Sequence, residues 1–248
     1  MRRMLKNCYR GAKRRFWRLP YKQYREVEWW QHDIASYVGW YTGKIPSLYG
    51  IPAPTPAMKV KGADMRESAL LTWIDVMQDS YPTRLAVPRD YFRGQRILDV
   101  GCGPLPLALG FTGCDIYGVD QLIHRYKRLG YPIEKFSSRM RYIQSSAEHI
   151  PVRDHAFDAV ISVNAIDHVD NFAAAAREIA RVLRPGGIIR MQVHYHPPAI
   201  CEPWGLDDEI VLKHFGGLGI RRVQEHVADV HERVMGDGEK LVVWSNRD

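Results

Sequence analysis

A glycine-containing stretch, Asp-Val-Gly-Cys-Gly-Pro at residues 99–104, follows an apolar run and is the first candidate for chemistry. Gly101 and Gly103 let the backbone turn sharply while its N–H groups stay open to a ligand, as in nucleotide-cofactor loops. The third glycine that often follows is absent, because Leu105 and Pro106 occupy those positions. After the loop we expect a slightly splayed helix, or one that begins later with proline in its first turn.

The next apolar run of the sequence ends in a carboxylate, which could bind the ribose of such a cofactor. Asp120 ends the following apolar run, 21 residues after Asp99, and it can accept two hydrogen bonds from a ribose diol. On these residues alone, a site for NAD and a site for S-adenosylmethionine fit almost equally well.

Side chains that could donate or accept a proton follow the two later apolar runs. Asp167 and His168 follow the first of them, and His194 comes at the end of the second. An imidazole with a pKa near 6.5 is a suitable base at neutral pH. We therefore predict His168, and second His194, as catalytic residues that serve as base or as ligand of the acceptor. The alternative is that His168 only bonds to its neighbour Asp167.

The segment His-Tyr-His-Pro-Pro, residues 194–198, together with Glu202 could also hold a divalent metal, because alternate residues of a strand point the same way. Two histidines and one carboxylate in a loop more often line a polar pocket. We predict no metal site here.

The elements that must position these residues follow an alternating pattern. From residue 95 onward, apolar runs of four to six residues alternate with helix-like segments, which is typical of βαβ units and a parallel sheet. Pro and Gly end a predicted helix at 184–187. We expect strands at 96–100, 115–120, 141–146, 157–163, 187–195, 220–230 and 240–246, and helices at 67–78, 171–183 and 206–215.

Four segments occur in a fixed order: Ile-Leu-Asp-Val-Gly-Cys-Gly-Pro at 97–104, Tyr-Gly-Val-Asp at 117–120, and the stretches 145–169 and 178–187. As a set they resemble the class I S-adenosylmethionine-dependent methyltransferases, especially the type 11 methyltransferase domain, over residues 95–195. The resemblance implies an α/β fold: a doubly wound, mostly parallel seven-stranded sheet with an antiparallel last strand, here with a helical N-terminal extension. It also implies S-adenosyl-L-methionine as cofactor.

The same resemblance implies a set of cofactor contacts. Gly101 and Gly103 would line the methionine and ribose end, and Asp120 would hold the ribose hydroxyls. Ser146 stands where the family has an acidic residue near the adenine, so this contact lacks a charge. The full predicted set is Asp99, Gly101, Cys102, Gly103, Asp120, Gln121, Ser146, Ala147, Glu148 and Asn164.

The positive charge is concentrated at the N-terminus. The net charge is +7, but residues 1–25 hold ten Lys or Arg and no acid, so residues 26–248 carry 25 basic against 28 acidic residues. This distribution argues against a nucleic-acid-binding surface on residues 26–248. On a helical wheel this N-terminal segment, the basic arm, is amphipathic. We expect it to pack on the body or a protein partner, with a membrane surface second and nucleic acid third; it also resembles a mitochondrial presequence, although it has no Ser.

Three regions follow from these patterns: the basic arm at 1–25, a helical cap region at 26–92 and the cofactor-binding domain at 93–248. Aromatic residues of the cap region, Trp40, Tyr41 and Trp73, either line an acceptor pocket or belong to the core. The four cysteines, which form no CxxC pair, indicate reduced thiols. Without an apolar run near ~18 residues, we expect a cytoplasmic protein, with peripheral membrane contact through the arm left open.

The function predicted from sequence is methyl transfer to a small molecule or a glycan, at oxygen. No Asn/Asp-Pro-Pro-Tyr/Phe element follows the fourth strand and no cysteine stands where a cytosine-C5 enzyme needs one, which argues against methylation of nucleic-acid bases. Two alternatives stay open. One is a non-catalytic scaffold that keeps the fold, and the other is an RNA methyltransferase that uses the arm as a phosphate clamp.

Overall fold

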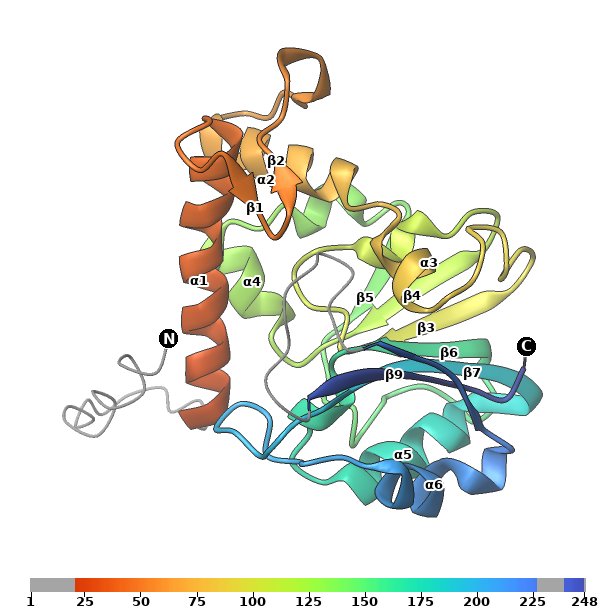
Figure 1. The fold of residues 1–248 in the computed structure, drawn as a ribbon. Coiled ribbons are helices and arrows are strands. Elements are labelled where there is room, and N and C mark those ends of the chain that lie inside the picture. The colour runs from red at the N-terminus through yellow and green to blue at the C-terminus, as the bar shows by residue number, and fades with distance from the viewer. Residues whose placement is uncertain (1–20, 227–238, 248) are drawn as a thin grey trace.

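The computed structural model describes residues 21–226 and 239–247, and these include one seven-stranded sheet. Its strand order is β5-β4-β3-β6-β7-β9-β8 (Figure 1). All strand pairs are parallel except the two made by β9, so the predicted doubly wound fold with an antiparallel last strand is confirmed. The strands are β3 Arg96–Val100, β4 Asp115–Val119, β5 Met140–Ile143, β6 Phe157–Val163, β7 Leu183–Tyr195, β8 Arg221–His226 and β9 Lys240–Ser245.

Helices cover both faces of the sheet, because the central strands are apolar on both sides. Neighbouring strand residues such as Ile97 and Leu98 point into two different core clusters. The first cluster contains residues of α1, α2 and α4, and the second contains residues of α5 and α6 on the opposite face (Figure 1). The helices are α1 Tyr21–Tyr41, α2 Met65–Val76, α3 Ser80–Arg84, α4 Ile123–Leu129, α5 Phe172–Val182 and α6 Asp208–Phe215, and a small hairpin of β1 Ser47–Leu48 and β2 Ile51–Pro52 contacts α1.

Side-chain caps fix where the predicted C-terminal helices begin. The Asn171 side chain accepts a hydrogen bond from the N–H of Ala174 at the start of α5. Asp207 does the same for the N–H of Ile210 at the start of α6. Such caps satisfy backbone donors that the first helical turn leaves without partners.

The helix expected after the glycine loop is not formed, and that prediction is wrong. Only a 3₁₀ turn, η3 Leu107–Gly110, follows the loop. Pro104 and Pro106 disfavour a longer helix because each lacks a backbone N–H. Tertiary packing adds to this effect: a Cβ on Gly110 would lie 1.9 Å from the carbonyl oxygen of Gln78, so the turn lies directly against the backbone that follows α2.

The strand boundaries that differ most from the predicted ones are those of β5, β7 and β8. β5 ends at Ile143, short of residue 146. β7 begins at Leu183 rather than residue 187, because Leu183 already pairs with Phe157 of β6. β8 ends at His226, and the rest of the predicted strand at 220–230 lies outside the described residues.

The N-terminal region packs directly onto the α/β fold. α1 continues through the predicted boundary at residue 25, while residues 1–20 of the arm lie outside the described residues. Trp40 and Trp73 are buried in the core with ring centroids 5.0 Å apart, so packing, rather than an acceptor pocket, accounts for these two aromatics. Within the described ranges, no helix is long and apolar enough to cross a membrane. The three-region division stays a prediction.

Candidate active site

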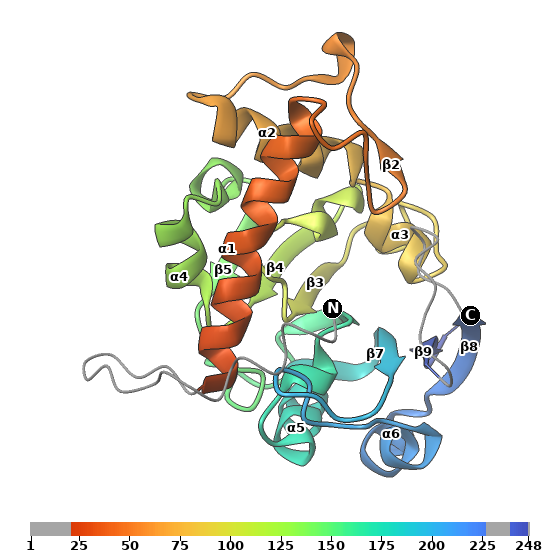
Figure 2. The ribbon, with the colours of Figure 1, turned by 60° about the vertical axis from the view of Figure 1, so that its left-hand side comes forward.

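The carboxyl ends of four neighbouring parallel strands bring most of the predicted site residues to one edge of the sheet. β3, β4, β6 and β7 all end there, and ligands of open α/β sheets bind beyond this edge. α1 crosses in front of these strand ends (Figure 2). The candidate site therefore lies at these strand ends, next to α1.

The glycine loop after β3 has the conformation that its two glycines were predicted to supply. Gly101 and Gly103 have φ values of 74° and 58°, in the left-handed region that favours glycine. A Cβ on Gly101 would lie 2.4 Å from the Cβ of Ala165, so this position also requires glycine for space. Leu105 is buried in the core and Cys102 lies against Gly118.

Asp120, directly after β4, connects the glycine loop to the start of α4. One carboxylate oxygen accepts from the N–H of Gly103 at 3.1 Å and the other from the N–H of Leu122 at 2.7 Å. Burial, and next the charge of Glu26, raise the pKa of Asp120 to about 7. A buried carboxylate with remaining lone pairs at this position fits the diol of a ribose.

We expect cofactor affinity to depend on pH through Asp120. The ionised carboxylate is the better acceptor for ribose hydroxyls, so affinity should rise about tenfold from pH 6 to pH 8 and then level off. The charged groups that act on Asp120 are Glu26, Asp99 and His168. Calorimetric titrations with S-adenosylhomocysteine over this pH range measure the effect. The Asp120→Asn variant should lose this rise, and an equal rise in that variant would contradict the assignment.

Three residues of α1 contact the cofactor edge, and sequence reasoning did not identify them. The Gln23 amide donates to the Gln121 side-chain oxygen at 2.5 Å. The Tyr126 hydroxyl donates to Glu26 at 3.3 Å. Trp30 lies 3.6 Å from where a Cβ on Gly103 would be. These contacts link residues about 70 to 100 positions apart, so no local sequence signal could have revealed them.

The residues predicted to lie near the adenine differ in the contacts that they make. Ser146 and Ala147 are partly buried in the turn after β5, where the Ser146 carbonyl accepts from the N–H of His149. The Glu148 carboxylate accepts from the N–H groups of Asp170 and Asn171. Glu148 therefore holds the segment before α5, and its side chain is committed to that contact rather than to the cofactor edge.

Several buried polar atoms without hydrogen-bond partners gather at the strand ends. Both carboxylate oxygens of Asp99 and the side-chain oxygen of Asn164 belong to this group, and burial raises the pKa of Asp99 well above its usual range. Buried polar atoms are normally paired, so an orphaned group calls for an explanation such as a bound ligand. Within the described residues, the members at or next to the ends of β3, β6 and β7 are Asp99, Asn164, Asp167, His168, Gln192 and His194.

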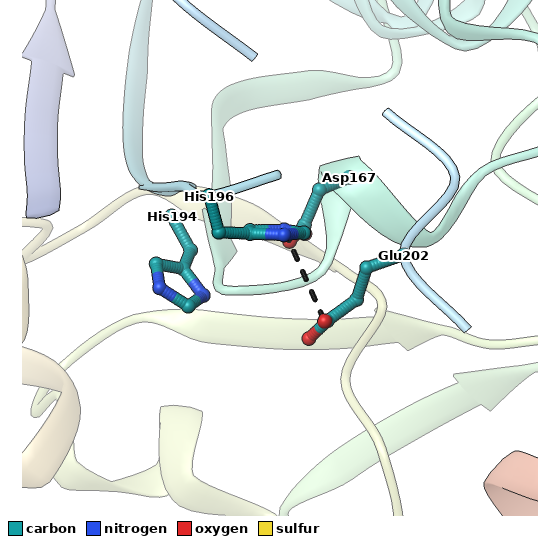
Figure 3. Close-up of side chains that lie close together, drawn as sticks. All are labelled: Asp167, His194, His196 and Glu202. Carbon is teal, nitrogen blue, oxygen red and sulfur yellow. Dashed lines mark hydrogen bonds and ion pairs between the residues drawn. The ribbon is translucent and has the colours of Figure 1, made fainter. Parts of the chain in front are cut away.

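The predicted catalytic histidines lie in a polar cluster on the same edge, and Figure 3 shows His194 with Asp167, His196 and Glu202 of that cluster. His168 ends the 3₁₀ turn η5 Ile166–His168, and its Nε2 lies 3.5 Å from Glu202. His194, near the end of β7, lies with its ring centroid 4.5 Å from that of His196. The His196 Nε2 is 3.0 Å from the buried carboxylate of Asp167. The structure thus brings both predicted histidines together with three further ionisable groups.

The two predicted histidines have opposite electrostatic environments. Burial opposes a charge on His168, but its pairing with Glu202 and the charges of Asp167 and Glu26 raise its pKa to about 9. Burial and the neighbouring His196 lower the pKa of His194. At neutral pH, His168 therefore carries a proton and His194 does not.

Comparisons with known proteins agree with this geometry. Residues 98–191 match the protein-family model described as "Methyltransferase domain". These residues form a class I S-adenosylmethionine-dependent methyltransferase domain. The domain contains the glycine loop, Asp120 and η5, and the predicted cofactor is the one that this family uses.

The curated relatives match only part of this chain. A sterol 24-C-methyltransferase from Gibberella zeae, ERG6B, is 35% identical over 100 residues, which are 38% of this chain and 26% of that protein. The sterol 24-C-methyltransferase ERG6 of Saccharomyces cerevisiae is 30% identical over the same shares. The chain spans about a quarter of the length of these relatives.

Solved structures show the same fold at low sequence identity. The YcgJ protein from Bacillus subtilis has a TM-score of 0.50 at 17% identity, over 69% of this chain and 96% of that one. A protein from Bacillus halodurans described as a methyltransferase has a TM-score of 0.51 at 16% identity, over 67% of this chain and 98% of that one. Both share the methyltransferase fold with this chain.

Proposed function

We propose that this chain transfers a methyl group from S-adenosylmethionine to an oxygen of a small polar molecule or a glycan. The observation that carries the proposal is the contact between Asp120 and the glycine loop, where the carboxylate accepts from the N–H of Gly103 and keeps lone pairs for a ribose. The buried side-chain oxygen of Asn164, directly after β6, has no partner among the described residues and supports a bound polar ligand at this edge.

The polar cluster supports a polar acceptor. Asp167, His168 and Glu202 lie beyond β6 and β7, at the edge where ligands of open α/β sheets bind, and we expect the acceptor to bind beside them. An apolar acceptor such as a sterol could form no hydrogen bonds with these groups, whereas a polar acceptor could, and a buried polar group short of partners costs about 1–3 kcal/mol. The similarity to the sterol enzyme ERG6B covers 38% of this chain and 26% of that protein, so it does not identify the acceptor.

The chain's residues would mainly hold the reactants in line. Bound at this edge, S-adenosylmethionine would supply an electrophilic methyl on a positively charged sulfur. Asp120 and the glycine loop would fix the ribose, and α1 would exclude water through Trp30. His168, protonated at neutral pH, would donate to the acceptor oxygen, so the role of acceptor ligand fits it better than that of resting base.

The test is a labelled-methyl transfer experiment. The full chain is incubated with S-adenosylmethionine carrying an isotopic methyl label and, separately, with small-molecule, protein and RNA fractions of a cell extract. We expect the label in the small-molecule fraction. Label in RNA would favour the alternative in which the basic arm clamps phosphates, and cofactor binding without any transfer would favour the scaffold alternative.

A substitution at His168 tests the acceptor-ligand role once an acceptor is in hand. His168→Asn removes a charged donor, so the KM for the acceptor should rise about tenfold to a hundredfold. Affinity for S-adenosylhomocysteine should fall much less, because His168 contacts Glu202 and its charge is the smallest of the causes that set the pKa of Asp120. A large fall in kcat with an unchanged KM would instead assign His168 as the base.

A further inference from the structure

We propose that the chain binds one divalent transition-metal ion, best matched by Zn²⁺, through Asp167, His194, His196 and Glu202. One potential ligand atom from each of these side chains lies within 4.8 Å of all the others, and Figure 3 shows the four groups converging on one point. This inference goes beyond methyl transfer and does not depend on it. It replaces the prediction of no metal, and it gives His194 a role as a ligand rather than as a base.

Two neighbouring strands supply the cluster. His194 lies near the end of β7 and His196 follows that strand by one residue, and alternate residues of an extended chain face the same side. Asp167 follows β6, which pairs with β7. Glu202 comes from the segment between β7 and α6. The cluster is thus built mainly on the ends of two paired strands.

The hydrogen bond on the far side of His196 is the one expected of a metal ligand. Its Nδ1 lies 2.7 Å from the carbonyl oxygen of Pro197, and a carbonyl can only accept, so Nδ1 carries a hydrogen. Metal-binding histidines typically donate their second N–H to such an oxygen. The other nitrogen, Nε2, faces Asp167 at 3.0 Å and Glu202 at 3.9 Å. A cation between these groups would bind all three.

Orphaned atoms in the same cluster provide an independent observation. The Oδ1 of Asp167 and the Nε2 of His194 are buried and make no hydrogen bond, although Glu239 lies 3.7 Å from that nitrogen. Asp167 is completely buried, at 0% exposure. Leaving such atoms unpaired costs about 1–3 kcal/mol each. A bound metal ion would pair both of them.

The donor set selects the class of metal. Two imidazole nitrogens and two carboxylates match the ligands and the fourfold coordination of Zn²⁺. Mg²⁺ and Ca²⁺ prefer oxygen ligands alone. The two negative carboxylates would balance the charge of a divalent ion. Such an ion would lie beside His168, because Glu202 contacts that side chain as well.

The experiment is a Zn²⁺ titration of the full chain after removal of metal by a chelator. We expect one equivalent of Zn²⁺ to bind, and Co²⁺ to give the visible absorption of a fourfold nitrogen and oxygen site. His194→Gln, His196→Gln and Glu202→Gln should each weaken Zn²⁺ binding at least about a hundredfold. His32→Gln, at an exposed histidine of α1, is the matched control and should bind like the native chain.

Three results would overturn the proposal: no Zn²⁺ binding by the native chain, equal binding by the cluster variants, or a Co²⁺ spectrum with thiolate bands. Far-UV circular dichroism and thermal unfolding of each variant show that the fold is retained. Glu202→Gln alters a partly exposed carboxylate, so it keeps the test valid if a histidine variant fails to fold. Binding of S-adenosylhomocysteine, measured on the same samples, separates a failed metal site from a failed cofactor site.

Discussion

Replacing Asp120 by Asn should weaken the binding of S-adenosylhomocysteine about tenfold to a hundredfold. The carboxylate would accept charge-assisted hydrogen bonds from the ribose, each of which contributes about 1.5–3 kcal/mol, and the neutral amide cannot replace them. The substitution also converts one oxygen that accepts a backbone N–H into a donor. Both effects lower affinity, and isothermal titration calorimetry measures their sum.

The stability of the Asp120→Asn variant should change little in comparison. Burial and Glu26 raise the pKa of Asp120 to about 7, so above that pH the native chain holds an unfavourable buried charge that Asn removes. Asp115→Asn, at the exposed first residue of the same strand, is the matched control and should bind normally. Equal affinity of the Asp120 and Asp115 variants would exclude a role for Asp120 in binding the ribose.

Replacing Gly101 by Ala should have the largest effect on the loop. The new Cβ would lie 2.4 Å from the Cβ of Ala165, at a φ of 74°. Left-handed backbone costs about 1–2 kcal/mol for a residue with a side chain, and overpacking costs about 1–3 kcal/mol more. We therefore expect a loss of about 2–5 kcal/mol in the free energy of unfolding, together with at least tenfold weaker cofactor binding.

Gly186→Ala separates backbone strain from steric overlap. Gly186 has nearly the same φ, 70°, but a Cβ there would have no neighbour within 4 Å. Its substitution should cost only the strain, about 1–2 kcal/mol, and leave cofactor affinity unchanged. Urea denaturation and calorimetry of both variants make the comparison. If the two substitutions had the same effect, close packing of Gly101 against Ala165 would have no part in shaping the loop.

The cofactor half of the fold was predictable because its signals are local. Apolar runs mark β3, β4 and β6, and each run is followed by residues predicted to contact the cofactor: the glycine loop, Asp120 and Asn164. In a parallel sheet these ends must meet at one edge. The order of the motifs along the chain was therefore enough to bring the residues together.

The rest depends on contacts between distant residues. The 3₁₀ turn that stands in place of the helix expected after the loop packs at Gly110 against the backbone of Gln78, a contact that no local pattern shows. Besides burial, the charge of Glu26 raises the pKa of Asp120, although Glu26 lies on α1, far from Asp120 in the sequence. His196 and Asp167, 29 positions apart, meet only because β6 pairs with β7. Tertiary structure thus determines the protonation states of the site, while the sequence predicts its location.

The binding of S-adenosylhomocysteine by the native chain, compared with that of NAD in the same calorimeter, tests the central claim most directly. The glycine loop and Asp120 should bind one molecule of S-adenosylhomocysteine per chain, at least about a hundredfold more tightly than NAD. Equal affinity for the two ligands, or binding of neither, would contradict the account.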